Sequence, residues 1–233
     1  AIPFKDEHGN ITAWIGTSID IDDKKKELEK KDEFISVASH ELKTPLTSLK
    51  GYIQLMEFEK EKLPENFAQY IKKANDSINK LQNLINDLLD VSKIQSGRLE
   101  FLVDKFNLSH LVKECIDNCI HIYPGYSFES EIEKNIFVKG NADRLEQVLM
   151  NLISNAVKYS PDINEIIVKL SREDGSVLVS VTDFGIGISK DQEKLIFDRF
   201  YRVNASKYFS TGLGVGLYIS SEIIKAHNGH MHV

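Results

Sequence analysis

His40-Glu41, followed by Thr44 one helical turn later, is the set of residues with the most evident chemistry in the first part of the chain. Apolar residues spaced three or four apart run through the same stretch, at Ile35, Ala38, Leu42, Leu46, Leu49, Ile53 and Met56. This spacing predicts one buried face on a long helix, with His40 and Thr44 on the outer side. The imidazole is then chemically accessible beside a carboxylate, although a solvated surface histidine is the alternative.

A polar stripe of Asn151, Asn155 and Lys158 recurs at four-then-three spacing in a helix predicted over residues 144–159. The core face of that helix is carried by Leu145, Val148, Leu149, Leu152 and Ala156. The stripe therefore lies on a separate face. Amide oxygens are suitable Mg²⁺ ligands, and a lysine is a point charge for phosphate, but an isolated stripe of this kind could equally be a solvated face.

Three further segments could complete a nucleotide site. A predicted strand ends at Asp183, whose carboxylate can accept a hydrogen bond from adenine N6, and Gly185 and Gly187 would let a flat base approach the backbone. An aromatic cluster over 197–202 precedes a polar stretch over 203–211, as at the base of a lid. The glycine-rich turn 212–216 runs into a helix predicted over 218–227 and offers backbone amides to an anion. Each segment is weak evidence alone, and the ordered set predicts a nucleotide site.

The Asp-Phe-Gly triplet at residues 183–185 also occurs in protein kinases. That interpretation is rejected, because the chain has no His-Arg-Asp loop, no glycine-rich loop followed by a strand lysine, and too few residues for that fold.

The elements that must position these residues form two kinds of structure. Phe67, Ile71, Ala74, Ile78, Leu81, Ile85 and Leu88 alternate four and three apart. They predict a second long helix, joined to the first by a polar turn at 57–65, and the two apolar seams predict a four-helix bundle made by dimerisation. The remaining chain predicts helices over 108–120 and 144–159 and strands over 128–132, 136–139, 165–170 and 177–182. These strands are expected to form an antiparallel sheet with the helices on one face, an α+β layer.

The composition excludes several classes of function. A net charge of −6 over 233 residues gives no basic field for nucleic acid. No apolar run approaches the roughly 18 residues that a membrane span needs, and no signal peptide is evident, which predicts a soluble, cytoplasmic segment without direct membrane contact. Cys115 and Cys119 lie four apart on a predicted helix and are expected to be buried and reduced, not zinc ligands or a disulfide.

Residues 1–5 and 11–21 predict two strands around a turn at 6–10. The pair, followed by Asp20-Ile21-Asp22, resembles the last hairpin of a PAS sensor domain. The charged residues 22–33 then predict a coiled-coil connector.

Residues 30–233 resemble the transmitter core of a sensor histidine kinase of a bacterial two-component system. The stretch 40–45 is similar to the H box of that family, 151–159 to the N box, 183–187 to the first glycine box, 197–202 to the F box and 212–216 to the second glycine box. The resemblance implies a sensor hairpin over 1–21, a connector over 22–33, a dimerisation and histidine-phosphotransfer domain over 34–98, and an ATP-binding domain of the GHKL (Bergerat) type over 99–233.

By the same resemblance, His40 would be the phosphoacceptor, Glu41 the acid or base beside it, Asn155 the Mg²⁺ ligand and Asp183 the adenine partner. The other nucleotide contacts implied are Asn151, Lys158, Tyr159, Gly185, Gly187, Ile188, Arg199, Thr211, Gly212, Leu213, Gly214, Val215, Gly216 and Leu217. Related ATPases place a carboxylate at position 151 to activate water, so an amide there favours transfer to histidine over hydrolysis.

The expected substrates and partners are ATP with Mg²⁺, a second copy of the chain, the receiver domain of a response regulator and the upstream sensor domain. Thr44 resembles the residue of the subgroup that also dephosphorylates the regulator. A scaffold with a degenerate nucleotide site and a GHKL ATPase whose hairpin only dimerises are the alternatives.

Two features depart from the family pattern. Leu213 replaces the usual Thr or Ser between the first two glycines, and Thr211 is the expected substitute for its hydroxyl. Residues 229–233 resemble the start of the final hairpin of the sheet, with His230 and His232 as surface residues of a strand.

Overall fold

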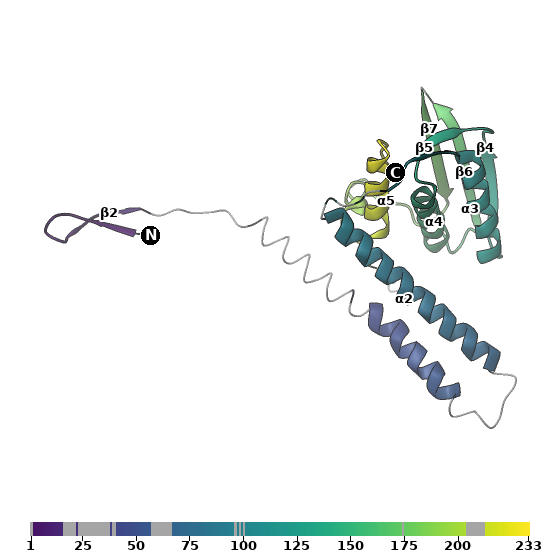
Figure 1. The fold of residues 1–233 in the computed structure, drawn as a ribbon, viewed down its shortest axis with the longest axis horizontal. Helices are drawn as coiled ribbons and strands as arrows, with labels where there is room; N and C mark the ends of the chain where they lie inside the picture. The colour runs from purple at the N-terminus through teal and green to yellow at the C-terminus, as the bar shows by residue number, and fades with distance from the viewer. Residues whose placement is uncertain are drawn as a thin grey trace. The chain divides into compact units, whose positions relative to one another are not determined.

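A computed structural model describes residues 2–15, 22, 38, 41–56, 67–95, 97, 99, 101–173, 175–203 and 213–233 (Figure 1). The chain divides into two compact units, residues 1–39 and 40–233. In the first unit, β1 (Ile2–Lys5) pairs antiparallel with β2 (Ile11–Ile15), which confirms the predicted hairpin over these residues. Its turn is held by Asp6, whose carboxylate accepts hydrogen bonds from the backbone N–H groups of His8 and Asn10. Residues 16–21, and all but Asp22 of the connector 22–33, lie outside the described residues.

The predicted helical hairpin is present in the second unit. Residues 41–56 are helical and lie beside α2 (Phe67–Gln95), as Figure 1 shows. The rings of Tyr52 and Tyr70 stack with their centroids 6.3 Å apart, and Lys80 Nζ lies 3.9 Å from a carboxylate oxygen of Glu41. Because 52 meets 70 while 41 meets 80, the two helices run antiparallel. His40 and the predicted turn at 57–65 lie outside the described residues.

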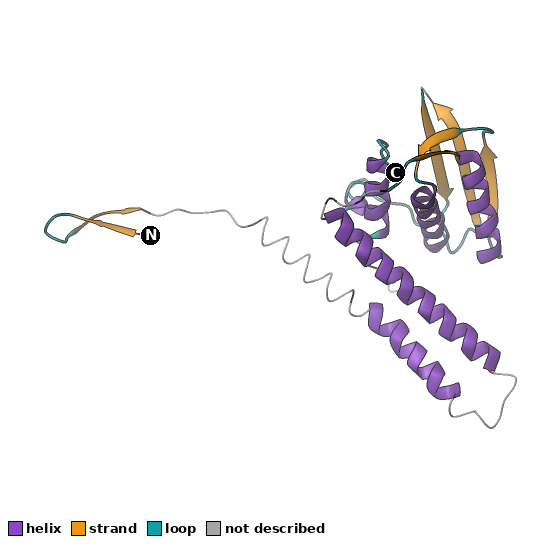
Figure 2. Ribbon diagram, viewed as in Figure 1, coloured by secondary structure: helices purple, strands orange, loops and turns teal. Residues whose placement is uncertain are grey.

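The described strands of the second unit all follow α2 in the chain (Figure 2). In chain order the elements are β3 (Asp104–Asn107), α3 (Leu108–Ile122), β4 (Ser127–Ile132), β5 (Phe137–Gly140), α4 (Ala142–Tyr159), β6 (Glu165–Glu173), β7 (Ser176–Asp183), the 3₁₀ turn η1 (Leu195–Phe197) and α5 (Gly216–Ala226). The helices α3 and α4 each begin with an asparagine cap. The side chain of Asn107 accepts a hydrogen bond from the N–H of His110, and that of Asn141 accepts one from the N–H of Arg144. Both contacts satisfy N–H groups that have no partner within the helix.

The sheet topology corrects the prediction of an all-antiparallel sheet. The order of the three-stranded sheet is β4-β6-β7, in which β6 and β7 are antiparallel but β4 and β6 are parallel. A parallel pair needs a crossover connection, and here β5 and α4 supply it between β4 and β6. The short strand β3, which the sequence did not indicate, pairs antiparallel with β5.

The core lies between α3, α4 and one face of the sheet. Alternate residues of β6, Ile166, Val168 and Leu170, are at most 2% exposed and pack with buried residues of both helices. This confirms that the helices cover one face. Cys115 and Cys119 are free and buried there, as predicted. Burial, with a smaller contribution from Glu146, raises the pKa of Cys115 to about 12, so this thiol stays protonated at neutral pH.

Residues 229–233 have no regular secondary structure, so the expected strand with His230 and His232 is not formed. The two histidine rings instead stack on each other with their centroids 5.9 Å apart. Among the described residues, no helix combines the length and hydrophobicity that crossing a bilayer requires.

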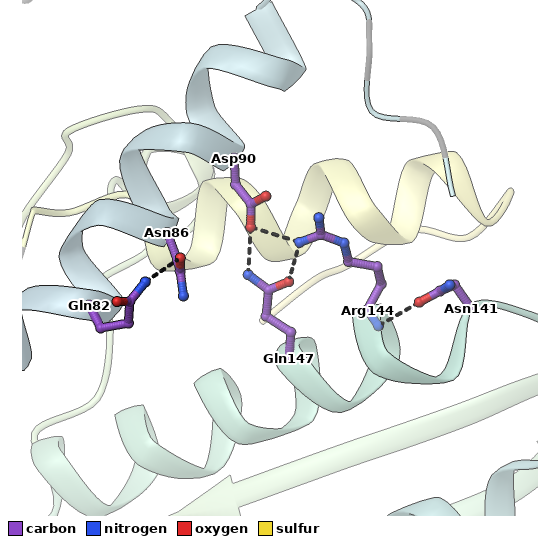
Figure 3. A network of polar contacts seen from close by, with 6 residues as sticks. All are labelled: Gln82, Asn86, Asp90, Asn141, Arg144 and Gln147. Atoms are coloured by element: carbon purple, nitrogen blue, oxygen red, sulfur yellow. Dashed lines mark hydrogen bonds and ion pairs between the residues drawn. The ribbon is translucent and has the colours of Figure 1, made fainter. Parts of the chain in front are cut away.

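A polar network joins α2 to α4 (Figure 3). Asp90, whose side chain is 7% exposed, accepts a hydrogen bond from Arg144 Nη1 at 2.8 Å and another from Gln147 Nε2 at 2.9 Å. Arg144 Nη1 also lies 2.8 Å from Gln147 Oε1, which closes a triangle of three side chains. A buried carboxylate is therefore paired across the junction between the hairpin and the α/β part of the unit.

Candidate nucleotide and phosphotransfer site

Glu41 and Thr44 occupy the first helical turn described in the segment 41–56. Glu41 is 8% exposed and faces α2, where Lys80 is its cationic neighbour. Thr44 is exposed one turn along the same helix. Lys80 was not singled out from the sequence, because it lies among ordinary charged positions beside the apolar seam and no local pattern marks it.

The predicted polar stripe lies on α4. Asn151, Asn155 and Lys158 are all partly buried at four-then-three spacing, and Lys158 Nζ lies 5.0 Å from the centre of the Tyr159 ring. Asn155 Nδ2 lies 3.4 Å from Asn151 Oδ1. The core residues Leu149, Ile153 and Ala156 lie on a different face of α4, as expected, whereas the buried Val148 stands seven residues before Asn155 and lies on the same side as the stripe.

The loop after β7 meets the C-terminal end of α4. The exposed carboxylate of Asp183 accepts the N–H of Gly185 at 2.9 Å, and the N–H of Ile186 donates to the carbonyl of Tyr159 at 3.2 Å. A Cβ at Gly185 would collide with the same carbonyl, so only glycine permits this approach. The structure thereby brings the loop that carries Asp183 and Gly185 to Tyr159 at the end of α4.

The glycine-rich turn meets the aromatic cluster and α4. The N–H of Phe200 donates to the carbonyl of Gly214 at 3.0 Å, and both residues have positive φ, 65° and 68°. A Cβ at Gly214 would approach the carbonyl oxygen of Tyr201 within 2.9 Å, and one at Gly216 would lie 2.6 Å from Asn151 Oδ1. These close approaches explain why glycines stand here, and they position the N-terminus of α5 beside the asparagine stripe.

Leu213 and Val215 cannot contact a nucleotide through their side chains, which are only 4% and 1% exposed. Only their backbone groups could line the site, and Leu213 fills the position of the usual hydroxyl with a core residue. Leu217 is partly buried, Ile188 is 39% exposed and Gly187 has a φ of 67°. Thr211 and Gly212 lie outside the described residues.

Arg199 lies over the ring of Tyr218, with its guanidinium carbon 5.8 Å from the ring centre. The F-box arginine is therefore held against α5 by a cation–π contact. Burial, followed by the nearby Glu222 carboxylate, raises the pKa of Tyr218, which keeps the phenol neutral at physiological pH.

The donor set on α4 fits a magnesium ion that arrives with a triphosphate. Within the described ranges, no three or more His, Cys, Asp or Glu side chains gather into a metal-binding group. A partly buried amide oxygen on Asn155 is compatible with Mg²⁺, which commonly takes one or two protein oxygens and completes its shell with phosphate oxygens and water.

Two families match the chain. Residues 30–97 match the His Kinase A (phospho-acceptor) domain, and residues 140–233 match the Histidine kinase-, DNA gyrase B-, and HSP90-like ATPase family. A helical hairpin of the phospho-acceptor family followed by an α/β domain of this ATPase family defines the class of this protein.

Relatives agree with this class. Sensor histidine kinase WalK of Bacillus subtilis is 30% identical over 96% of this chain, which spans 37% of that relative's length. The structure of histidine kinase AdeS of Acinetobacter baumannii has the same fold, with a TM-score of 0.60 and 24% identity over 80% of this chain and 86% of that chain. Full-length ShkA, solved in complex with AMPPNP, gives a TM-score of 0.60 and 25% identity over 86% of this chain and 42% of that one. The chain belongs to the sensor histidine kinases of two-component systems.

Proposed function

We propose that this chain transfers the γ-phosphoryl group of ATP to His40 and then to an aspartate of a response regulator. The observation that carries the proposal is that the Asp183 loop and the Gly214–Gly216 turn both meet α4, the helix that carries Asn151 and Asn155. Phe184, Ile186 and Ile188 expose 39% to 51% of their surface around the Asp183 loop, as an apolar lining for a base would. Asp183 would accept from the amine of adenine and select it.

In the proposed reaction, the neutral imidazole of His40 attacks the γ-phosphorus in line as ADP leaves, and Glu41 takes or orients the proton of the ring. Lys80 Nζ lies 3.9 Å from a carboxylate oxygen of Glu41 and is its cationic neighbour on α2. Lys158 would hold phosphate oxygens. Asn155 would hold Mg²⁺, which when bound offsets charge on the phosphates.

The test is incubation of the whole chain with γ-labelled ATP and Mg²⁺, comparing wild type, His40→Gln and His110→Gln. His110 is a matched control, because it is exposed and also lies beside a carboxylate, that of Glu114 at 3.0 Å. We expect acid-labile, alkali-stable label in wild type and His110→Gln and none in His40→Gln. Label that persists in His40→Gln contradicts the proposal. Free phosphate released without labelled protein supports the ATPase alternative, and ATP binding without either product supports the scaffold.

We also propose that Thr44 positions water for dephosphorylation of the regulator. Thr44 is exposed one turn beyond the acceptor position, as this role requires. Thr44→Ala should leave labelling of His40 near normal and slow the loss of phosphate from the regulator. Thr47→Ala is the control, because the Thr47 hydroxyl is already bonded to the carbonyl of Lys43 at 2.8 Å. Equal rates of loss in both variants would refute this role.

Three further proposals concern context. The exposed side chains of Ile71, Ile78 and Ile85 on α2 support a homodimer formed through the helical hairpin. The hairpin formed by β1 and β2 supports the end of a PAS-type sensor domain over residues 1–21. Use of ATP and the buried reduced cysteines support a cytoplasmic location.

A further inference from the structure

Ser220 is a buried hydroxyl of α5 that contacts the asparagine stripe. It is 2% exposed, and its Oγ accepts a hydrogen bond from Asn151 Nδ2 at 2.9 Å. Gly216 lies one turn earlier on the same face of α5, where a Cβ would come within 2.6 Å of Asn151 Oδ1. One turn of α5 therefore holds the Asn151 amide by a hydrogen bond to its nitrogen and by close packing against its oxygen.

The constraint on Asn151 passes to Asn155. Asn151 Oδ1 is the acceptor that faces Asn155 Nδ2, at 3.4 Å. An amide that turns its nitrogen toward one neighbour presents its oxygen to the other side. The order Ser220, Asn151, Asn155 thus leaves Asn155 Oδ1 as the atom presented to a cation. In this series of hydrogen bonds, Ser220 bonds to Asn151 and not to Asn155. Any effect of Ser220 on the cation therefore passes through Asn151.

We propose that Ser220 is a positioning residue for Mg²⁺: through Asn151 it orients the Asn155 amide so that an oxygen faces the metal that accompanies ATP. The inference rests on the proposed ATP site. Without the hydroxyl, Asn151 Nδ2 loses its acceptor in a partly buried environment and rotates to find another, which carries Oδ1 away from Asn155. Groups behind a metal ligand commonly change metal affinity ~10-fold or more when they are removed.

The test measures binding of a fluorescent ATP analogue to the whole chain, in Mg²⁺ and in EDTA. The variants are Ser220→Ala, Ser220→Cys and Ser221→Ala. Ser221 is a matched control, because it is 7% exposed on the same helix but points about 100° away from Ser220. Ser220→Cys nearly keeps the volume and replaces the hydroxyl by a weak acceptor. Thermal unfolding of each variant shows that the fold is retained.

We expect Ser220→Ala to raise the Mg²⁺ concentration for half-maximal enhancement of binding about tenfold. Its affinity in EDTA should match wild type, Ser220→Cys should be intermediate, and Ser221→Ala should match wild type in both conditions. A Mg²⁺ dependence in Ser220→Ala and Ser220→Cys equal to that of wild type overturns the inference. Loss of affinity by the same factor with and without Mg²⁺ also overturns it, because that is the result of altered packing alone. Absence of nucleotide binding by wild type would instead remove the proposed function on which the inference rests.

Discussion

Gly185 illustrates at the scale of one residue how a missing Cβ shapes the site. Its backbone lies against the carbonyl of Tyr159, so Gly185→Ala forces the loop after β7 away from α4. We expect a loss of about 1–3 kcal/mol in the free energy of unfolding, as for other overpacked positions, together with weaker ATP binding. Chemical denaturation and nucleotide titration measure both. Gly125→Ala is the control, because a Cβ there meets no atom within 4 Å, and equal stability of the two variants would contradict the expectation.

Asp87 makes the stability of α2 depend on pH. Burial, and secondly the charge of Asp90, raise its pKa from 3.8 to about 6. Between these two values the folded state binds the proton more tightly than the unfolded state does, so this group lowers stability as pH rises through that window. Asp87→Asn should therefore be more stable than wild type above pH 6, and the difference should shrink below about pH 4.

Urea denaturation across this pH range is the appropriate measurement for Asp87→Asn. Asp76→Asn, at an exposed position of the same helix, is the control. A stability difference between wild type and Asp87→Asn that stays constant with pH would show that the Asp87 carboxyl is not responsible.

At the scale of elements, the triangle of Asp90, Arg144 and Gln147 ties α2 to the first turns of α4. Removing one member of a buried charge pair leaves its partner uncompensated, but the Arg144 side chain is 24% exposed and water can reach it. We therefore expect Asp90→Ala to cost about 2 kcal/mol in the free energy of unfolding, below the range for fully buried pairs.

The same Asp90→Ala variant should speed hydrogen exchange in the first turns of α4, because α2 no longer holds them. Asp76→Ala, an exposed acid on α2, should change neither the stability nor the exchange. Identical behaviour of the two variants would mean that the network does not stabilise this junction.

For the molecule taken as a whole, the described residues of the helical hairpin leave part of its apolar surface exposed. Ile71, Ile78 and Ile85 repeat every seven residues and are 40% to 46% exposed, whereas Ala74, between them, is 7% exposed. Among the described residues, the seam is thus buried at Ala74 but not at these three isoleucines. A second copy that contributes the same surface would bury the rest as a four-helix bundle.

Ile78→Asp should therefore convert the dimer to a monomer, with half the mass in light scattering, because a charge would be buried in the bundle. Ile163→Asp is the control, since Ile163 is 47% exposed but lies between α4 and β6, outside the hairpin. Ile78→Asp with the mass of wild type would contradict the proposed dimer surface.

Features that depend on neighbours in the sequence could be predicted from it. The two hairpin helices, the stripe of Asn151, Asn155 and Lys158, and the antiparallel pairing of β6 with β7 follow from periodicity and short turns. These interactions involve residues a few positions apart, so the order of amino acids determines them.

The contacts between segments far apart in the sequence became evident from the fold alone. Periodicity gives no strand direction, so it could not reveal that β4 pairs parallel with β6. It also could not show that Leu213 fills the core, that Asp90 reaches Arg144 54 residues away, or that Ser220 meets Asn151 across 69 residues. A buried serine or aspartate carries no local signal, because its partner is chosen by the packing of whole helices. The order of amino acids thus identifies which residues could do the chemistry, whereas the packing of α2 and α5 on α4 fixes what holds those residues in place.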